Sequence, residues 1–271
     1  MKLKKLRKIY RILFPLRLSV KELFINNLRS NLLIKEFEEL KNIYSLRLTN
    51  GTVLYMRDEN HSDYSVFKQI FNLEEYKIVA SILKNNPEFS NETVMIDAGS
   101  NVGYATVYLQ QFLKFDKIIC VEPSKNNIEI LSRNIEPLNC SINPIILENA
   151  LAATENLSFN IEKDFRDGKD WSLTTKVSKE GKVQGVTING IIKENDLKYI
   201  TLLKIDIEGA ERFIFNANND LSFLRITKII AIEIHDEFNI RDTIYTILKQ
   251  NGFYLFESGE LTIGVNNVTI Q

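Results

Sequence analysis

The fold is decided by residues 93–123, which read TVMIDAGSNVGYATVYLQQFLKFDKIICVEP. This stretch holds two short apolar runs, which end in the acids Asp97 and Glu122. Residues 103–114 between the two runs show a helical pattern of apolar positions. Two buried strands joined by a helix predict a parallel pair with a crossover connection.

The same alternation continues toward the C-terminus. Further apolar runs predict three more buried strands, with helices around 124–136, 209–218 and 240–250; the strands are INPIILENA, TLLKIDIEG and KIIAIEIHD. The result is a doubly wound α/β sheet that is mostly parallel. FYLFES and LTIGVNN are separated only by Gly259-Glu260, which requires an antiparallel C-terminal hairpin. This closure is typical of class I (Rossmann-like) methyltransferases. Residues 157–188 add β-like segments outside the main sheet.

The glycine pattern after the first strand separates two classes of ligand. A nicotinamide dinucleotide fingerprint that starts at Gly99 needs glycines at 101 and 104, where Asn101 and Tyr104 stand. Gly99 and Gly103 still allow a sharp turn and close approach of a ligand to the backbone. The spacing therefore argues against a diphosphate and against a nicotinamide-dependent oxidoreductase.

The acids at the strand ends favour S-adenosylmethionine (SAM). The carboxyl ends of parallel strands line one crevice, where Asp97 suits the ammonium group of SAM and Glu122 can accept hydrogen bonds from both ribose hydroxyls. The alternative is that both acids only cap the following helices. Asn149, at the end of the third strand, is expected at the adenine unless it is simply a turn residue. The predicted cofactor site comprises Asp97, Gly99, Asn101, Gly103, Glu122, Pro123, Asn149 and Ala150.

Several of these motifs resemble the FkbM family of SAM-dependent methyltransferases. The similarity covers roughly residues 60–256 and rests on DAGSNVG (97–103), VEP (121–123), NALA (149–152), LKIDIEGAE (203–211) and IEIHD (232–236). SDYSVFKQIFNLEEY (62–76) resembles the family segment that precedes the fold, and we expect it to cover the cofactor. The resemblance implies an O-methyltransferase that acts on a hydroxyl of a sugar, a glycan or a related natural product.

The fourth and fifth strand ends carry the candidate catalytic residues. Asp206 and Glu208 alternate with isoleucines, as do Glu233 and His235, so each pair shares a face of its strand. We predict that His235 is the base, with Asp206 and Glu233 orienting it or the substrate. Asp206, Glu233 and His235 could instead hold Mg or Mn. A further alternative is that Glu208 caps the next helix and His235 is a hydrogen-bonded core residue.

The N-terminal part has a different character. Residues 1–40 are predicted helical, with an interruption at Pro15 and a second helix from Ser19 to Leu40. IYSLRLTNGTVLYMRD then predicts a β-hairpin that turns at Asn50-Gly51, and residues 65–85 form a helix. The predicted domains are a basic helical segment with a β-hairpin, 1–60, and a class I SAM-dependent methyltransferase domain, 61–271.

Charge and composition limit the partners. Residues 1–30 carry nine Lys or Arg against one acid, while the rest has 25 basic against 34 acidic residues. This acidic body argues against a nucleic-acid substrate. Two cysteines, no apolar run of about 18–20 residues and no signal pattern predict a cytoplasmic protein. The basic segment is expected to pack on the domain or a second subunit, or to touch the inner face of an anionic membrane. The remaining rival function is a non-catalytic SAM-binding or scaffolding protein of a glycan-assembly system.

Overall fold

The computed structural model describes residues 18–85, 92–138, 140–162, 174–178 and 180–266. The chain separates into two compact units, Met1–Asn60 and His61–Gln271. The described part contains no helix that is long and apolar enough to span a membrane.

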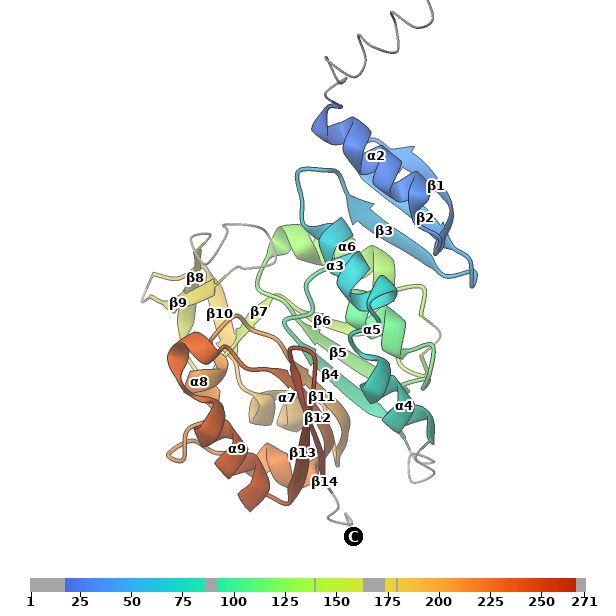
Figure 1. The fold of residues 1–271 in the computed structure, drawn as a ribbon. Coiled ribbons are helices and arrows are strands. Elements are labelled where there is room, and N and C mark those ends of the chain that lie inside the picture. Colours follow the sequence, from blue (N-terminus) through green and yellow to red (C-terminus); the bar gives the residue numbers. More distant parts are fainter. Residues whose placement is uncertain (1–17, 86–91, 139, 163–173, 179, 267–271) are drawn as a thin grey trace, which may run out of the picture. The chain divides into compact units, whose positions relative to one another are not determined.

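The N-terminal unit is a helix followed by a three-stranded antiparallel sheet (Figure 1). Helix α2 (Val20–Ser30) begins with a capping box, in which Ser19 and Glu22 satisfy each other's backbone N–H groups. Strands β1 (Ile34–Leu40), β2 (Ile43–Leu48) and β3 (Val53–Arg57) follow in spatial order.

One N-terminal prediction is wrong. The helix predicted from Ser19 to Leu40 ends at Ser30, and the rest of that range is β1. Pairing with β2 overrides the local helical pattern, because it brings the ring of Phe37 within 6.3 Å of Tyr44. The hairpin at Asn50-Gly51 is confirmed by the pairing of β2 with β3. The helix predicted before Pro15 lies outside the described residues.

The second unit is built on a seven-stranded sheet (Figure 1). Its order is β13-β14-β12-β11-β4-β5-β6, and β14 is antiparallel to both neighbours. The strands are β4 (Val94–Ala98), β5 (Lys117–Val121), β6 (Ile145–Leu147), β11 (Ile200–Ile205), β12 (Thr227–Glu233), β13 (Phe253–Ser258) and β14 (Leu261–Asn266). The predicted doubly wound sheet with an antiparallel C-terminal hairpin is confirmed.

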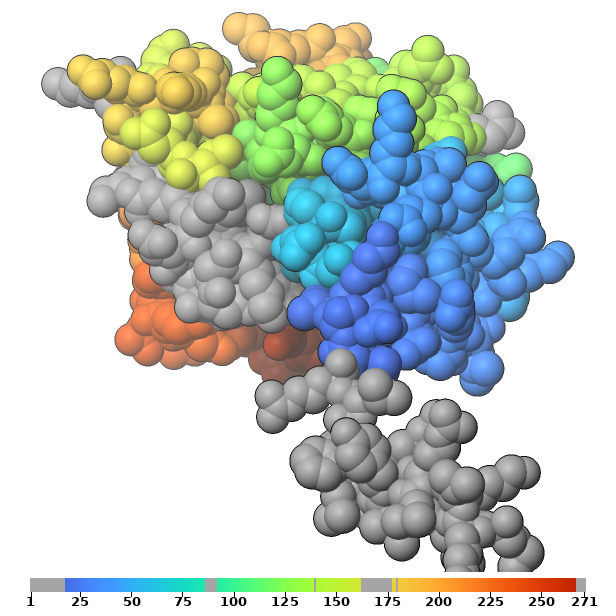
Figure 2. All heavy atoms as spheres, turned by 90° about the horizontal axis from the view of Figure 1, so that it is seen from above, coloured from blue at the N-terminus to red at the C-terminus, as the bar shows by residue number. Residues whose placement is uncertain are grey.

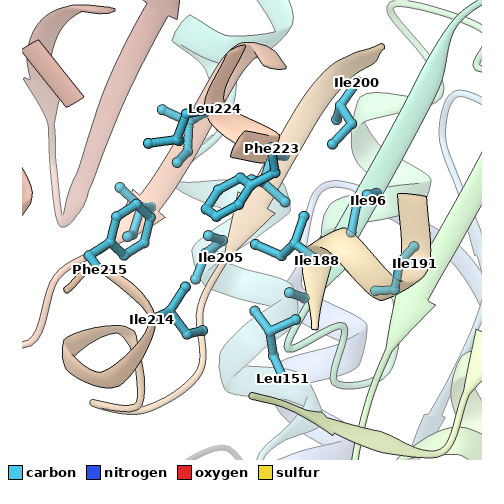
Figure 3. Close-up of a cluster of buried hydrophobic side chains, with 14 of the residues drawn as sticks. Ile96, Leu151, Ile188, Ile191, Ile200, Ile205, Ile214, Phe215, Phe223 and Leu224 are labelled. Atoms are coloured by element: carbon cyan, nitrogen blue, oxygen red, sulfur yellow. The ribbon is translucent and has the colours of Figure 1, made fainter. Parts of the chain in front are cut away.

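Helices cover both faces of this sheet. Figure 1 shows α4 (Lys77–Asn85), α5 (Tyr104–Leu109) and α6 (Lys125–Ile135) on one face, and α7 (Ile188–Glu194), α8 (Glu211–Ile214) and α9 (Arg241–Gln250) on the other. The main core lies under the second set, where strand residues such as Ile96 and Ile205 meet Ile188 of α7 and Phe223 (Figure 3). Each such buried side chain contributes roughly 1.5–3 kcal/mol.

The third predicted strand is corrected. In the main sheet it ends at Leu147, and Asn149–Leu151 is a separate strand, β7, of a second sheet. That sheet has the order β7-β10-β8-β9, with β8 (Ser158–Glu162), β9 (Thr174–Val177) and β10 (Val183–Val186). Atoms of this second sheet, yellow to gold, are visible on the face drawn in Figure 2, while Ala150, Phe159 and Val183 form its small buried core. The β-like segments predicted outside the main sheet are therefore present, although α7 begins at Ile188, where Thr187 caps it.

The segment before β4 is not the single helix that the sequence predicts. It consists of α3 (Asp63–Phe67), a π-helical turn η1 (Lys68–Asn72), a break and then α4. Glu74 adopts a left-handed backbone (φ 51°) at the break. Phe71 packs on Tyr104 and Tyr108, with ring centroids 6.1 and 5.6 Å apart. These contacts fix the segment against α5, next to the glycine-containing turn.

Candidate active site

A cavity of about 1040 Å³ opens at the carboxyl ends of β4, β11 and β12. Four parts of the second unit line it: residues 65–76, the turn 99–105, the ends of β11 and β12, and the hairpin turn 258–260. The first of these was expected to cover the cofactor, and it forms one wall. The arrangement follows from the parallel sheet, which brings strand ends distant in sequence to one edge.

The turn after β4 is shaped for close packing and close approach. Gly99 has φ 78°, and a Cβ atom there would stand 1.7 Å from the carbonyl oxygen of Asp206. Gly103 is also left-handed (φ 83°) and stands directly before α5, at its N-cap position. Asn101 has φ 49° without being glycine, and its buried Oδ1 has no hydrogen-bond partner among the described residues. All three predicted residues thus shape the turn, and Asn101 presents an unsatisfied acceptor at the cavity.

Asp97 is buried and does not line the cavity. Its carboxylate lies 3.1 Å from Nζ of Lys204 and accepts a hydrogen bond from the Thr106 hydroxyl at 2.6 Å. Asp97 therefore binds the ammonium group of Lys204 beneath the turn. A direct contact with the ammonium group of SAM stays a prediction.

Lys204 is a residue that the sequence reasoning missed. It is buried in β11, donates to the carbonyl of Gly99 at 2.6 Å and lies 3.6 Å from Oδ2 of Asp206. Burial lowers its pKa, but the charges of Asp97 and Asp206 outweigh that effect and raise it overall. Lys204 is therefore a permanent cation that joins the turn after β4 to the end of β11. A lysine two positions before Asp206 in an otherwise apolar strand was the available signal.

Glu122 is buried and engaged by the protein itself. It accepts hydrogen bonds from the backbone N–H groups of Asn101 (2.9 Å) and Ser124 (2.9 Å) and from Nδ2 of Asn127 (3.1 Å). Burial raises its pKa, against the lowering effect of these bonds. Glu122 thus fixes the turn after β4 and the start of α6, as the capping alternative expected in part. A carboxylate accepts about four hydrogen bonds, so the predicted ribose contact stays open.

The other predicted cofactor residues lie farther from the cavity wall. Pro123 follows Glu122 directly and does not line the cavity. Asn149 and Ala150 belong to β7, paired with Gln184 and Gly185 of β10, and Nδ2 of Asn149 donates to the carbonyl of Gln184 at 3.0 Å. Their contact with adenine stays a prediction.

The predicted catalytic acids line the cavity, but the predicted catalytic histidine does not. Asp206, Glu208 and Glu233 line the cavity, whereas His235 lies behind them and is 1% exposed. Nε2 of His235 is 3.3 Å from Oε2 of Glu208 and 3.7 Å from Oε1 of Glu233, and Nδ1 is 2.8 Å from Oε1 of the buried Glu211. Three carboxylates therefore surround one imidazole.

These surroundings change the protonation of the cluster. Burial lowers the pKa of His235, but Glu208 and Glu211 outweigh it and raise the pKa to about 10. Burial, followed by the charge of Asp206, raises the pKa of Glu233 to about 8. His235 is therefore an imidazolium near neutral pH, with no open nitrogen to accept a proton. This geometry does not support the base role predicted for His235, and it agrees with the alternative of a hydrogen-bonded core histidine.

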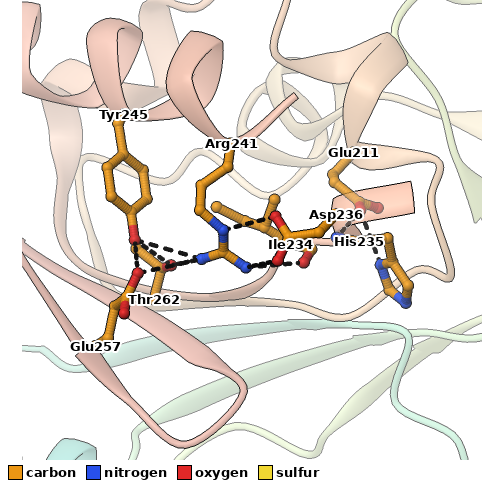
Figure 4. A network of polar contacts seen from close by, with 8 residues as sticks. All are labelled: Glu211, Ile234, His235, Asp236, Arg241, Tyr245, Glu257 and Thr262. Atoms are coloured by element: carbon orange, nitrogen blue, oxygen red, sulfur yellow. Dashed lines mark hydrogen bonds and ion pairs between the residues drawn. The ribbon is translucent and has the colours of Figure 1, made fainter. Parts of the chain in front are cut away.

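The turn that carries His235 is held by a polar network (Figure 4). Arg241 of α9 binds both carboxylate oxygens of Asp236 at 2.7 and 2.8 Å and donates to the carbonyl of Ile234 at 3.2 Å. The hydroxyl of Tyr245 donates to Glu257 at 2.6 Å, which ties α9 to β13. The end of β12 is thus fixed by a bidentate charged contact.

The acids of the cavity do not form a metal-binding group. Among the residues that the structure describes, no group of three or more His, Cys, Asp or Glu is placed to hold a metal ion. The proposed set of Asp206, Glu233 and His235 is therefore not supported as a metal site.

In the wall formed by residues 65–76, burial raises the pKa of Glu75 to about 6, an effect that the charges of Asp206 and Glu260 reinforce. Glu75, which accepts a hydrogen bond from Gln69 at 2.8 Å, is another lining acid that sequence reasoning missed.

The chain is similar to known methyltransferases. The family described as "Methyltransferase FkbM domain" matches residues 97–255. Methyltransferase sdnD of Sordaria araneosa is 24% identical over 69% of this chain and 81% of its own length, and Methyltransferase 1 of Beauveria bassiana is 23% identical over 61% and 74%. The solved structure of M. jannaschii TYW2 in complex with AdoMet covers 85% of this chain and 88% of that chain at 14% identity, with a TM-score of 0.41.

Proposed function

Because this chain belongs to the FkbM methyltransferase family, we propose that it transfers the methyl group of SAM to a hydroxyl of a sugar, a glycan or a related natural product. One observation carries the proposal. A single cavity brings the glycine-containing turn after β4 together with the carboxylates that end β11 and β12. One wall is shaped for a bound ligand and the other offers groups that accept a proton.

The residues present fit SAM. Gly99 leaves the turn without a side chain at its closest approach to Asp206, and the Oδ1 of Asn101 lacks a partner at the cavity wall. The turn 99–105 and Glu122 would hold the cofactor, with Lys204 fixing the turn from below. When bound, SAM supplies an electrophilic methyl group on its sulfonium.

Glu233 is the base that the geometry favours. It lines the cavity, and the pKa that burial raises to about 8 matches a group that takes up a proton near neutral pH. With SAM bound in this site, Glu233 would take up the proton that the acceptor hydroxyl loses when its oxygen receives the methyl group. Asp206 lies on the same wall and accepts a hydrogen bond from the acceptor. Alignment of the reacting atoms supplies most of the acceleration.

The cavity lining supports a neutral, hydroxyl-rich acceptor. Six acids but only two lysines line it, and one of those lysines, Lys204, is already bound by Asp97 and Gly99. Carboxylates, amides and hydroxyls such as those of Gln69 and Ser258 accept hydrogen bonds from sugar hydroxyls. A phosphate group or a nucleic-acid backbone would meet like charge instead.

Binding and transfer test this proposal separately. Calorimetry is expected to show micromolar affinity for SAM, roughly −8 kcal/mol, and Glu122→Ala should weaken it at least tenfold. Incubation with methyl-labelled SAM and matched sugar alcohols and amino compounds should place the label on oxygen. Undiminished affinity in both Asp97→Ala and Glu122→Ala removes the basis of the cofactor site. Tight SAM binding without transfer to any acceptor would favour the scaffolding alternative.

For localisation, we propose a cytoplasmic protein whose basic N-terminal residues 1–30 touch an anionic membrane surface. Nine basic residues against one acid support this in the sequence. In the described part, Val20, Leu23 and Leu32 are 65%, 49% and 91% exposed. Exposed apolar side chains next to basic ones suit the boundary between headgroups and acyl chains.

A further inference from the structure

The loop between β11 and α8, together with the first residue of α8, places two acids on either side of one imidazole. Glu208 and Gly209 are consecutive left-handed residues, with φ 50° and 85°, and a Cβ atom on Gly209 would lie 2.3 Å from the ring of Phe238. A left-handed non-glycine residue costs of order 1 kcal/mol or more, so such strain persists only where the surroundings enforce it. The turn puts Glu208 on the cavity wall and buries Glu211 completely.

Glu211 fixes His235 through a single oxygen. Its Oε1 accepts a hydrogen bond from the backbone N–H of His235 at 2.9 Å and lies 2.8 Å from the ring Nδ1 (Figure 4). The backbone nitrogen of Gly209 also lies 3.2 Å from Nδ1. The contact with the carboxylate is shorter and, with Glu211 ionised, requires a proton on Nδ1. Both the backbone and the ring orientation of His235 are thereby set.

The opposite ring nitrogen faces the cavity acids. Nε2 lies 3.3 Å from Glu208 and 3.7 Å from Glu233, and both of those side chains line the cavity. Glu208 comes from the loop after β11 and Glu211 is the first residue of α8, whereas Glu233 ends β12 and His235 follows it by two residues. A positive charge on the His235 ring attracts the carboxylates of Glu208 and Glu233 from the side away from the cavity. Both carboxylates remain accessible from the cavity itself.

We propose that Glu211 and His235 are positioning residues: Glu211 holds the His235 ring as an imidazolium, and the imidazolium fixes Glu233 and Glu208 for the acceptor hydroxyl. This inference rests on the proposed function. A buried imidazolium without a counter-charge would be costly, which explains why Glu211 is fully buried beside it. Glu211 does not line the cavity, so it acts only through His235.

Three variants test the linkage by kinetics. Glu211→Gln keeps the shape but removes the charge, so His235 loses its proton more readily and Glu233 becomes harder to ionise. We expect kcat to fall by about 10²-fold, the rising limb of the pH–rate profile, on which Glu233 ionises, to move to higher pH, and the Kd for SAM to stay within about twofold. His235→Gln should do the same, and the double variant should be no worse than His235→Gln alone. Glu211→Asp should recover part of the rate.

Asp116→Asn provides the matched control. Asp116 accepts hydrogen bonds from Thr93 and Ser141 before β5, at the other end of the sheet. Its loss removes one carboxylate charge without touching the cluster, and the pH–rate limb should stay in place. If the limb of Glu211→Gln also stays in place while kcat falls, Glu211 is only structural and the positioning role is refuted.

A measurement on the wild-type protein does not depend on activity or on any variant. The chain contains only two histidines, so the ring resonances of His235 can be separated from those of His61 by NMR. The imidazolium is expected to persist above pH 8. Deprotonation of His235 near its ordinary value of about 6.5 would overturn the inference even if methyl transfer is confirmed. A protein that shows the imidazolium but transfers no methyl group would refute the proposed function instead.

Discussion

At the residue scale, Lys204 links the turn after β4 to Asp206, an acid that lines the cavity. It is buried among Asp97, Asp206 and the carbonyl of Gly99. Lys204→Met keeps the side-chain volume but leaves Asp97 buried without its cation, which is expected to cost about 3–5 kcal/mol of unfolding free energy. Urea unfolding measures this loss. Lys198→Met is the control, because Lys198 pairs with Asp196 at an exposed site and should cost less than about 1 kcal/mol. Equal losses would contradict the account.

The residue scale also shows what a sequence can and cannot predict. Asp206, Glu208 and Glu233 were predicted from the two-residue alternation at strand ends, and all three line the cavity. The histidine was on the same pattern, but its burial behind Glu208 depends on the left-handed turn at Glu208 and Gly209, which no periodicity reveals. Lys204 and Glu75 were missed because a single charged residue within an apolar strand or a helical segment carries no local signal of a functional role.

At the element scale, the segment of α3 and η1 forms one wall of the cavity. Phe71→Leu should remove its ring contacts with Tyr104 and Tyr108 while keeping most of the apolar volume. We expect a stability loss of about 1–1.5 kcal/mol and a several-fold rise in the Kd for SAM, because the wall shifts away from the turn 99–105. Calorimetry measures the binding. Phe256→Leu, at an exposed position of β13, is the control and should change neither quantity.

Element prediction succeeded where pattern and pairing agree. The strands of the main sheet and the hairpin of β13 and β14 follow from apolar runs and from a two-residue connection. It failed at Ile34–Leu40, where a helical pattern became β1, and at Asn149–Leu151, where one apolar run serves two sheets. In both cases the deciding partner lies elsewhere in the chain: β2 for the first and β10 for the second.

At the scale of the whole molecule, the cluster predicts how stability depends on pH. The folded-state pKa values of Glu75, Glu233 and His235 are all raised, to about 6, 8 and 10. At these three groups the folded state therefore binds more protons than the unfolded state between about pH 4.5 and pH 10, and stability falls as pH rises through this range. The Tm without ligand should be lower at pH 8.5 than at pH 5.5. Each kcal/mol of unfolding free energy lost between these pH values should lower the Tm by roughly 2–4 °C. A constant or rising Tm would contradict this, and Glu233→Gln should flatten the slope.

The basic N-terminal residues make a second prediction at this scale. The full chain should co-sediment with anionic vesicles at low salt and be released at about 0.5 M salt, where charge attraction is screened. Two controls are included. A chain that lacks residues 1–18 should not co-sediment with anionic vesicles, and the full chain should not co-sediment with vesicles of neutral lipid. Leu23→Glu should weaken binding, because Leu23 is an exposed apolar residue within the basic residues 1–30. If the full chain ignores anionic vesicles, these residues instead pack on protein, as the sequence also allowed.

The pH–rate profile tests the central claim, that a cavity carboxylate and not the histidine accepts the proton. The rate should rise with pH as Glu233 ionises, with an apparent pKa near 8 in kcat/KM for SAM. Glu233→Gln should lower the rate by about 10²–10⁴-fold and abolish the rise, while His235→Gln should keep the rise and move it to higher pH. A rise near pH 6.5 that disappears in His235→Gln but survives in Glu233→Gln would make His235 the base and contradict the account.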